Sequence, residues 1–219
     1  MDRISREKQL KRRIGIGAAV VVAVPLIILA CVLFKGGSTN KEAVYKPGVY
    51  TETGYESAAV GYRFVAPEGC ILSTEEQLVE LMGTSYELLK SEYDEMDLYY
   101  TQQATVYDMM ASMPSGVNVN VIWARTEGSI KEEDIVESVK KELEALEFMN
   151  VSVQEGYDKA KIAGREYIKM VSTAEMQGVK MIQEYYVDAQ KGYSVSMTVT
   201  YYEGYEAERD ALINAFEEK

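Results

Sequence analysis

The sequence predicts an α+β domain, a mainly antiparallel β-sheet with packed helices, preceded by one N-terminal transmembrane helix. Two stretches alternate apolar and polar residues with a period of two, from Val117 to Ala124 and from Tyr193 to Tyr201, which is typical of β-strands. Helical spacing separates groups of strands and follows the last of them, and short turns join many of the strands, so hairpin connections dominate. An uncharged apolar run, residues 14–34, precedes all of these elements.

Residues 14–34 predict a membrane-spanning helix. A helix of this length extends about 31 Å, which matches the hydrocarbon thickness of a bilayer. Six basic side chains lie within residues 1–13, whereas only Lys35 and Lys41 closely follow the run. Because the more basic flank stays in the cytoplasm, we expect a cytoplasmic tail at 1–13, a signal anchor at 14–34, and the rest of the chain outside the cell membrane.

Cys31 offers a second mode of anchoring, as the lipidated N-terminus of a lipoprotein. The small residue Ala30 precedes it, but Leu29 stands where lipoprotein signals usually have a small or hydroxyl residue, and apolar residues continue after the cysteine. A cleaved signal also has a shorter apolar region, of about 7–15 residues. The sequence favours the uncleaved anchor and leaves lipidation of Cys31 as the alternative.

Composition excludes several kinds of site. The chain has no histidine, which excludes a His-ligated zinc site, a Ser-His-Asp triad and a Cys-His pair. The net charge is -12 and residues 1–13 carry +4, so the remainder carries -16, whereas nucleic-acid binding needs basic surface. We expect no catalytic, cofactor or metal residues and no nucleic-acid partner. A hydrolase of cell-envelope or glycan substrates, working through paired carboxylates, stays the enzymatic alternative.

The first half of the expected domain begins after a flexible linker. Residues 35–47 form this linker, because small and polar residues dominate its first part, and Pro47-Gly48 marks the start of one domain at 48–219. A capping box from Ser73 to Glu76 predicts a helix through Met82, and a second helix is expected over 85–93. The expected strands are 49–53, 58–65, 104–112 and 117–124.

The second half contains two more helices and the longest strands. Ile135, Val139, Leu143 and Leu146 repeat at helical spacing and predict a helix over 131–148. A final helix is expected near 205–217. The expected strands are 151–157, 165–174, 179–188 and 193–201, with a hairpin turn at 190–192 (QKG) between the last two.

Three short stretches resemble motifs of the PsbP-like fold family, a fold shared with a eukaryotic Ran-release factor and bacterial extracytoplasmic proteins. They are 61–69 (GYRFVAPEG), 162–167 (IAGREY) and 183–187 (QEYYV). The first contains an "aromatic, apolar, Pro, x, Gly" turn and the second an "apolar, x, Gly, x, x, Tyr" turn, both typical of that family. The resemblance covers about residues 48–219. It implies an α/β sandwich that serves as a binding or accessory module, with no shared catalytic residues to carry over.

Adjacent tyrosines form the candidate binding surface, and the pairs are Tyr99 and Tyr100, Tyr185 and Tyr186, and Tyr201 and Tyr202. Neighbours on a strand point to opposite faces, so one tyrosine of each pair is expected to face water or the covering helices. Exposed tyrosines are well suited to contact a protein or a glycan. The alternative is that these rings lie at the boundary of the core with their hydroxyls in contact with water. We therefore expect a single-pass membrane protein whose extracytoplasmic domain binds an envelope protein or a glycan.

Overall fold

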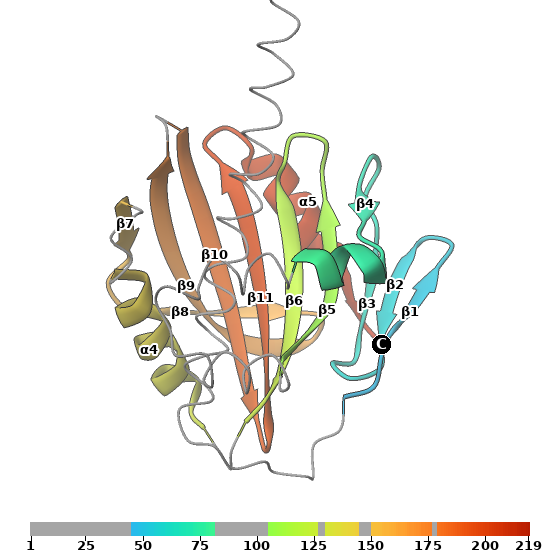
Figure 1. The fold of residues 1–219 in the computed structure, drawn as a ribbon, viewed down its shortest axis with the longest axis horizontal. Coiled ribbons are helices and arrows are strands. Elements are labelled where there is room, and N and C mark those ends of the chain that lie inside the picture. Colours follow the sequence, from blue (N-terminus) through green and yellow to red (C-terminus); the bar gives the residue numbers. More distant parts are fainter. Residues whose placement is uncertain (1–44, 82–104, 127–129, 145–149, 177–178) are drawn as a thin grey trace, which may run out of the picture.

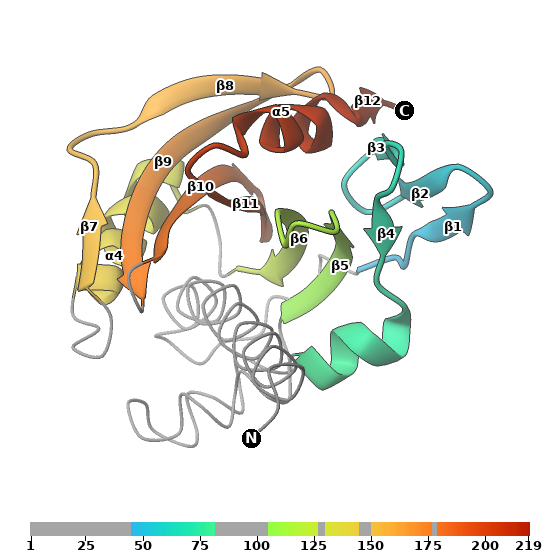
Figure 2. The ribbon, with the colours of Figure 1, turned by 90° about the horizontal axis from the view of Figure 1, so that it is seen from above.

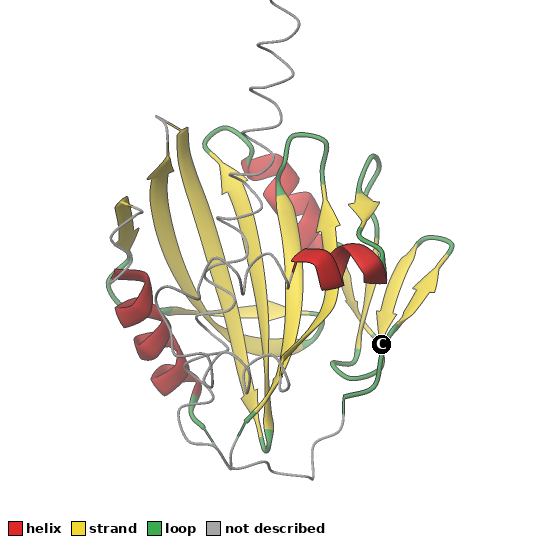
Figure 3. Ribbon diagram, in the orientation of Figure 1, coloured by secondary structure: helices red, strands yellow, loops and turns green. Residues whose placement is uncertain are grey.

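The computed structural model describes residues 45–81, 105–126, 130–144, 150–176 and 179–219. Strands dominate these ranges and helices separate groups of strands, which confirms the predicted α+β class (Figure 3). The predicted tail, the anchor with Cys31 and most of the linker fall outside the described residues, as do Tyr99, Tyr100 and the helix expected over 85–93. No helix within the described ranges is long and apolar enough to cross a membrane.

The described part of the chain forms two antiparallel sheets (Figure 1). The smaller sheet has the order β1-β2-β3-β12, with strands Val49–Thr51, Gly54–Ser57, Tyr62–Val65 and Phe216–Glu218. The larger sheet has the order β4-β5-β6-β11-β10-β9-β7, and β8 also pairs with β9. Its strands, β4 to β11 in chain order, are Ile71–Leu72, Thr105–Ser112, Asn118–Arg125, Asn150–Val153, Asp158–Ile162, Arg165–Met176, Val179–Gln190 and Tyr193–Tyr202.

Helices α4 (Glu132–Glu144) and α5 (Glu206–Asn214) pack on opposite faces of the larger sheet (Figure 2). α4 buries Ile135, Val139 and Leu143 against β9 and β10, as its helical spacing predicted. α5 buries Leu212 against the other face, which the smaller sheet also covers. The larger sheet is therefore the middle layer of a sandwich.

This central position buries both faces of β6. The sequence predicts one buried face, and Val121 and Trp123 do lie in the core beneath the smaller sheet. The other face is buried as well, because Asn118, Asn120 and Ile122 are at most 4% exposed. The polar residues of the alternation thus form a buried polar strip, in which Asn120 lies opposite Thr198 of β11.

Several element boundaries differ from the prediction for local reasons. The expected strand 58–65 is a turn followed by β3, because Gly61 has a φ of 83° and its N–H donates to the Ser57 carbonyl at 3.1 Å. The expected helix 205–217 ends at Asn214, and β12 follows. The strand expected at 151–157 ends at Val153, whereas the hairpin turn at 190–192 is confirmed.

The capping box is displaced by one residue. The helix spans 75–81 within the described range, and its reciprocal caps are Thr74 and Gln77 instead of Ser73 and Glu76. The Thr74 N–H donates to Gln77 Oε1 at 2.9 Å, and the Gln77 N–H donates to Thr74 Oγ1 at 3.4 Å. These bonds satisfy two backbone donors at the helix start and fix the direction in which the helix leaves β4.

The hairpin between β8 and β9 contains a strained alanine. Its two loop residues, Ala163 and Gly164, have φ values of 48° and 78°, as a type I′ turn requires. A left-handed backbone costs alanine about 1 kcal/mol, and asparagine tolerates it better. We expect Ala163→Asn to raise the free energy of unfolding by about 0.5–1 kcal/mol, measured by urea unfolding. Ala163→Val should lower it, and equal stability of the three proteins would contradict the strain.

Candidate functional site

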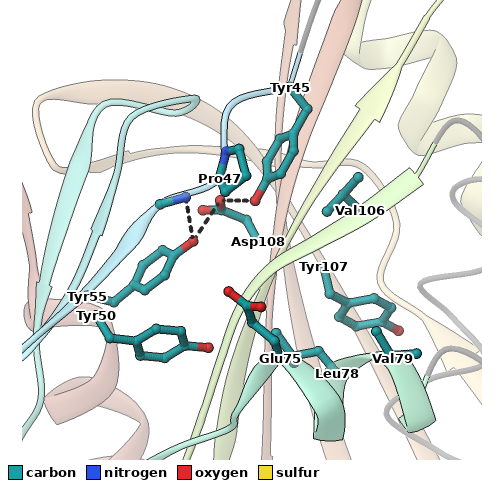
Figure 4. Close-up of a pocket in the computed structure, with 11 residues that line it drawn as sticks. Tyr45, Pro47, Tyr50, Tyr55, Glu75, Leu78, Val79, Val106, Tyr107 and Asp108 are labelled. Atoms are coloured by element: carbon teal, nitrogen blue, oxygen red, sulfur yellow. Dashed lines mark hydrogen bonds between the residues drawn. The ribbon is translucent and has the colours of Figure 1, made fainter.

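A half-open cavity of about 240 Å³ lies where the β1–β2 hairpin, the helix at 75–81 and β5 meet (Figure 4). β4 pairs with only Ala111 and Ser112 of β5, so the first half of β5 faces the cavity. Tyrosines, carboxylates and small apolar groups line it. The lining residues are Tyr45, Pro47, Gly48, Tyr50, Tyr55, Glu75, Leu78, Val79, Val106, Tyr107 and Asp108.

Asp108 is the centre of a buried hydrogen-bond cluster at this cavity. Its side chain is 3% exposed. Tyr45 and Tyr55 donate to Oδ1 at 2.8 and 3.1 Å, and Tyr62 donates to Oδ2 at 2.7 Å. We call Asp108 and these three tyrosines the tyrosine hub. The hub ties residue 45, β2 and β3 to β5, so one carboxylate joins the smaller sheet to the larger one.

A β-bulge aims Asp108 at the tyrosines. Tyr107 lies opposite Ile122 and Met109 lies opposite Val121, so Asp108 is an extra residue in β5. A bulge leaves the extra residue unpaired and redirects its side chain. Asp108 therefore points toward the smaller sheet, on the same side as Met109, while Tyr107 packs into the core on the opposite side.

The electrostatics of the hub keep its tyrosines protonated. Burial and the negative charge of Asp108 raise the pKa of Tyr45, Tyr55 and Tyr62. All three hydroxyls are therefore donors at neutral pH. No lysine or arginine among the described residues pairs with Asp108, so only neutral donors stabilise its charge in this part of the chain.

Gly48 is required by the close approach of Tyr55. The Gly48 N–H donates to the Tyr55 hydroxyl at 3.1 Å, and a Cβ atom at position 48 would lie 2.3 Å from the same hydroxyl oxygen. Next to this contact, the Tyr45 ring packs on Trp123, with ring centroids 5.5 Å apart. The glycine of the Pro47-Gly48 pair thus belongs to the cavity wall as well as to the domain boundary.

Large apolar side chains are exposed around the cavity. Val79 and Tyr50, which line it, are 70% and 40% exposed. Val49 of β1 and Ile71 of β4 are also exposed, at 64% and 66%, but they are not among the residues that line the cavity. The Tyr50 hydroxyl donates to the Ser73 carbonyl at 2.7 Å and so connects β1 to the segment after β4. We call Tyr50 and Val79, the two exposed side chains that line the cavity, the apolar rim.

The tyrosines singled out by the sequence lie elsewhere. Tyr185, Tyr186 and Tyr201 are at most 6% exposed, and Tyr202 is half-buried. Tyr185 faces the α4 side of the sheet and donates to Gln183, whereas Tyr186 and Tyr201 face the other side and donate to Glu184. The structure does not bring these four residues into one exposed surface.

The sequence did not single out the residues of the cavity and its hub, for two reasons. Tyr45 and Pro47 lie in the expected linker, and Asp108 lies inside an expected strand, where it looked like one polar position among many. The available signal was a lone carboxylate within the apolar run of β5, next to Tyr107 and Met109. A group of three or more acidic or cysteine side chains that could hold a metal ion does not occur among the described residues.

No protein-family model and no curated protein sequence matches this chain. Solved structures with a similar fold include CyanoP, the cyanobacterial PsbP of Synechocystis sp. PCC 6803, at 11% identity and a TM-score of 0.44, covering 84% of this chain and 99% of that one. LpqN of Mycobacterium tuberculosis, described as involved in cell envelope biogenesis, is 10% identical with a TM-score of 0.44, over 71% and 82% of the two chains. A Bacteroides thetaiotaomicron VPI-5482 protein is 9% identical with a TM-score of 0.41, over 80% of this chain and 49% of its own.

CyanoP is a PsbP, and PsbP-like proteins are the family whose motifs the sequence resembles. Identities of 9–11% concern the fold alone, and the TM-scores lie below 0.5. What the chain binds must therefore be argued from the cavity itself.

Proposed function

We propose that residues 45–219 form the binding domain of a membrane-anchored extracytoplasmic protein, and that the cavity beside Asp108 is its binding site. The observation that supports this proposal is a cavity bordered by the buried tyrosine hub and by the exposed apolar rim. The hub fixes the wall of a cavity on three separate chain segments, and concave sites with a few fixed polar groups are typical of binding sites. Exposed apolar side chains that line such a site, here Tyr50 and Val79, also favour contact with another molecule.

We propose a binding role in preference to a catalytic one. Asp108 accepts three hydrogen bonds from tyrosines, two at Oδ1 and one at Oδ2, so among the described residues it serves as a shared acceptor. The raised pKa values of Tyr45 and Tyr55 also disfavour a phenolate nucleophile. These contacts support a carboxylate that holds structure in place.

The site can be tested by photo-crosslinking in living cells. A photoreactive phenylalanine analogue replaces Val79 at the rim, and we expect a specific adduct of the full-length protein after irradiation. Val179 is the matched control, because it is an exposed valine, 49% accessible, that does not line the cavity. Equal adduct patterns from both positions, or no adduct from position 79, would contradict the proposed site.

The anchor and its orientation are part of the same proposal and need a separate test. They are supported by the uncharged run at 14–34 and the basic residues that precede it. Protease added to intact cells should digest the domain, and protection of the domain would contradict the orientation. Mass spectrometry of the N-terminal peptide distinguishes the modes of anchoring, since a diacylglycerol on Cys31 would replace the signal anchor with lipidation.

A further inference from the structure

We infer that the cavity recognises a cation on a narrow alkyl stem, specifically the lysine side chain of a partner protein. This inference rests on the proposed binding site and adds the chemical class of its ligand. Three independent features carry it: the charges that face the cavity, the rings that line it, and the surface that surrounds it.

The charges that face the cavity are negative. Asp108 and Glu75 line it, and none of the described residues that line it is basic. In Figure 4 Asp108 points from β5 to the hydroxyls of Tyr45 and Tyr55, and Glu75 extends from the first turn of the helix into the space between the helix and these residues. The Tyr50 hydroxyl lies close enough to both carboxylates to be affected by them, because burial and the charges of Glu75 and Asp108 raise its pKa. A cation in this space would meet one buried carboxylate and one at the mouth.

The walls of the cavity suit a cation with an apolar stem. Tyrosine rings line it from three chain segments, at Tyr45, at Tyr50 and Tyr55, and at Tyr107. A cation near the face of such a ring gains about 0.5–2 kcal/mol. The volume of about 240 Å³ is smaller than the roughly 300–1,000 Å³ of most small-molecule sites. A single protruding side chain fits this space better than a whole metabolite does.

The surroundings favour a protein as the source of this side chain. The apolar rim offers two exposed side chains at the mouth of the cavity, and protein interfaces typically place one anchor residue in a pocket within an apolar ring that excludes water. Residues 14–219 also carry a net charge of -16, which attracts a basic partner surface. The rim would have no comparable role for a free amine.

The test uses the full-length protein in detergent micelles and defined probes. Binding of n-butylammonium chloride is measured by ligand-observed saturation-transfer NMR, against n-butanol and against sodium chloride at equal ionic strength. We expect saturable binding of the ammonium alone. Trp123, the chain's single tryptophan, packs on Tyr45, so its fluorescence should change over the same concentrations. Equal binding of butanol, or no binding of butylammonium, would overturn the inference that the ligand is a cation.

The position of the site is tested with matched charge changes. Glu75→Gln should weaken butylammonium binding about fivefold, because it removes one of the two charges. Glu137→Gln removes the same charge from an exposed position on α4 and should leave the affinity unchanged. Equal effects of the two substitutions would place the ammonium elsewhere on the acidic surface and overturn the inference.

A peptide arm identifies the source of the cation. The peptide acetyl-Val-Lys-Val-amide should bind at least about tenfold more tightly than butylammonium, because its valines cover the apolar rim. The same peptide with norleucine in place of lysine should not bind saturably. A lysine peptide no tighter than butylammonium would indicate a free amine as the ligand and overturn the protein source. A photo-adduct at position 79 without any ammonium binding would support the proposed binding site and overturn the inference that its ligand is a cation.

Discussion

Replacement of Asp108 by alanine is expected to lower the free energy of unfolding by about 4 kcal/mol. The substitution removes the common acceptor of three tyrosine hydroxyls, and Tyr55 and Tyr62 are at most 3% exposed, so water does not readily replace it. Each buried hydroxyl left without a partner costs about 1–3 kcal/mol. Urea unfolding of the full-length protein in detergent micelles, followed by the fluorescence of Trp123, measures the change.

Two substitutions separate the hydrogen bonds of the hub from its shape. Asp108→Asn keeps the size of the side chain and one acceptor oxygen, and should cost about half as much as alanine. Tyr62→Phe removes one donor of the hub and should cost about 1 kcal/mol. If Asp108→Ala cost less than about 1 kcal/mol, the hydroxyls would have found other acceptors, and the hub would not be what joins the two sheets.

Regular alternation made the centre of the larger sheet predictable. β6 and β11 stand next to each other in the middle of the sheet, and their apolar positions, Val121 and Val195 among them, are fully buried as expected. A central strand keeps its period of two along its whole length, because the same neighbours flank every residue. The turn at 190–192 was equally predictable, since Gly192 has the φ of 88° that few other residues adopt.

The short strands were not predictable, because their partners come from distant parts of the chain. β4 contains only Ile71 and Leu72, and β12 contains three residues. Phe216 is a strand residue because it pairs with Phe64, far away in the sequence, and the helical pattern before it simply continues into this position. Local propensity is weak in such segments, so tertiary pairing decides their structure.

The candidate site was hidden for a related reason. A bulge, which periodicity does not reveal, sets the direction of Asp108, and Tyr45 reaches it from a segment with the composition of a linker. The tyrosine pairs were more conspicuous in the sequence, yet Tyr186 and Tyr201 serve a structural acid, Glu184. Residue type alone predicted the tyrosine–carboxylate contacts neither at Asp108 nor at Glu184. Both sets of contacts depend on which strands become neighbours.

The buried carboxylates Asp108 and Glu184 differ in how their charge is balanced. Glu184 is 3% exposed and lies within 3.1 Å of the Lys169 ammonium and 2.6 Å of the Arg209 guanidinium. Those cations also lie over the rings of Tyr186 and Tyr201, at 5.6 and 5.2 Å from the centroids. Glu184 therefore has internal cations, whereas Asp108, among the described residues, has tyrosines and a cavity. This contrast is a physical reason to expect an external cation at Asp108 and none at Glu184.

Glu184→Gln is expected to lower the free energy of unfolding by about 3 kcal/mol at neutral pH, because it leaves two partly buried cations without their counter-charge. Burial raises the pKa of Glu184, but hydrogen bonding from Tyr186 and the positive charges of Lys169 and Arg209 outweigh it, so the pKa is lowered. A lowered carboxyl pKa contributes stability above the pKa of the unfolded chain and loses it as pH falls through the folded value. The stability difference between wild type and Glu184→Gln should therefore be constant near neutrality and shrink below about pH 4.5.

Urea unfolding at a series of pH values measures this difference, and an exposed ion pair supplies the control. Glu166 pairs with Lys159 at 2.6 Å, and the side chains are 67% and 70% exposed. Glu166→Gln should leave the free energy of unfolding unchanged within error at every pH, because water and salt screen such a pair. If the stability difference for Glu184→Gln persisted unchanged to pH 3, its cost would come from the altered packing of the side chain. The charge at position 184 would then not be what holds α5 to the sheet.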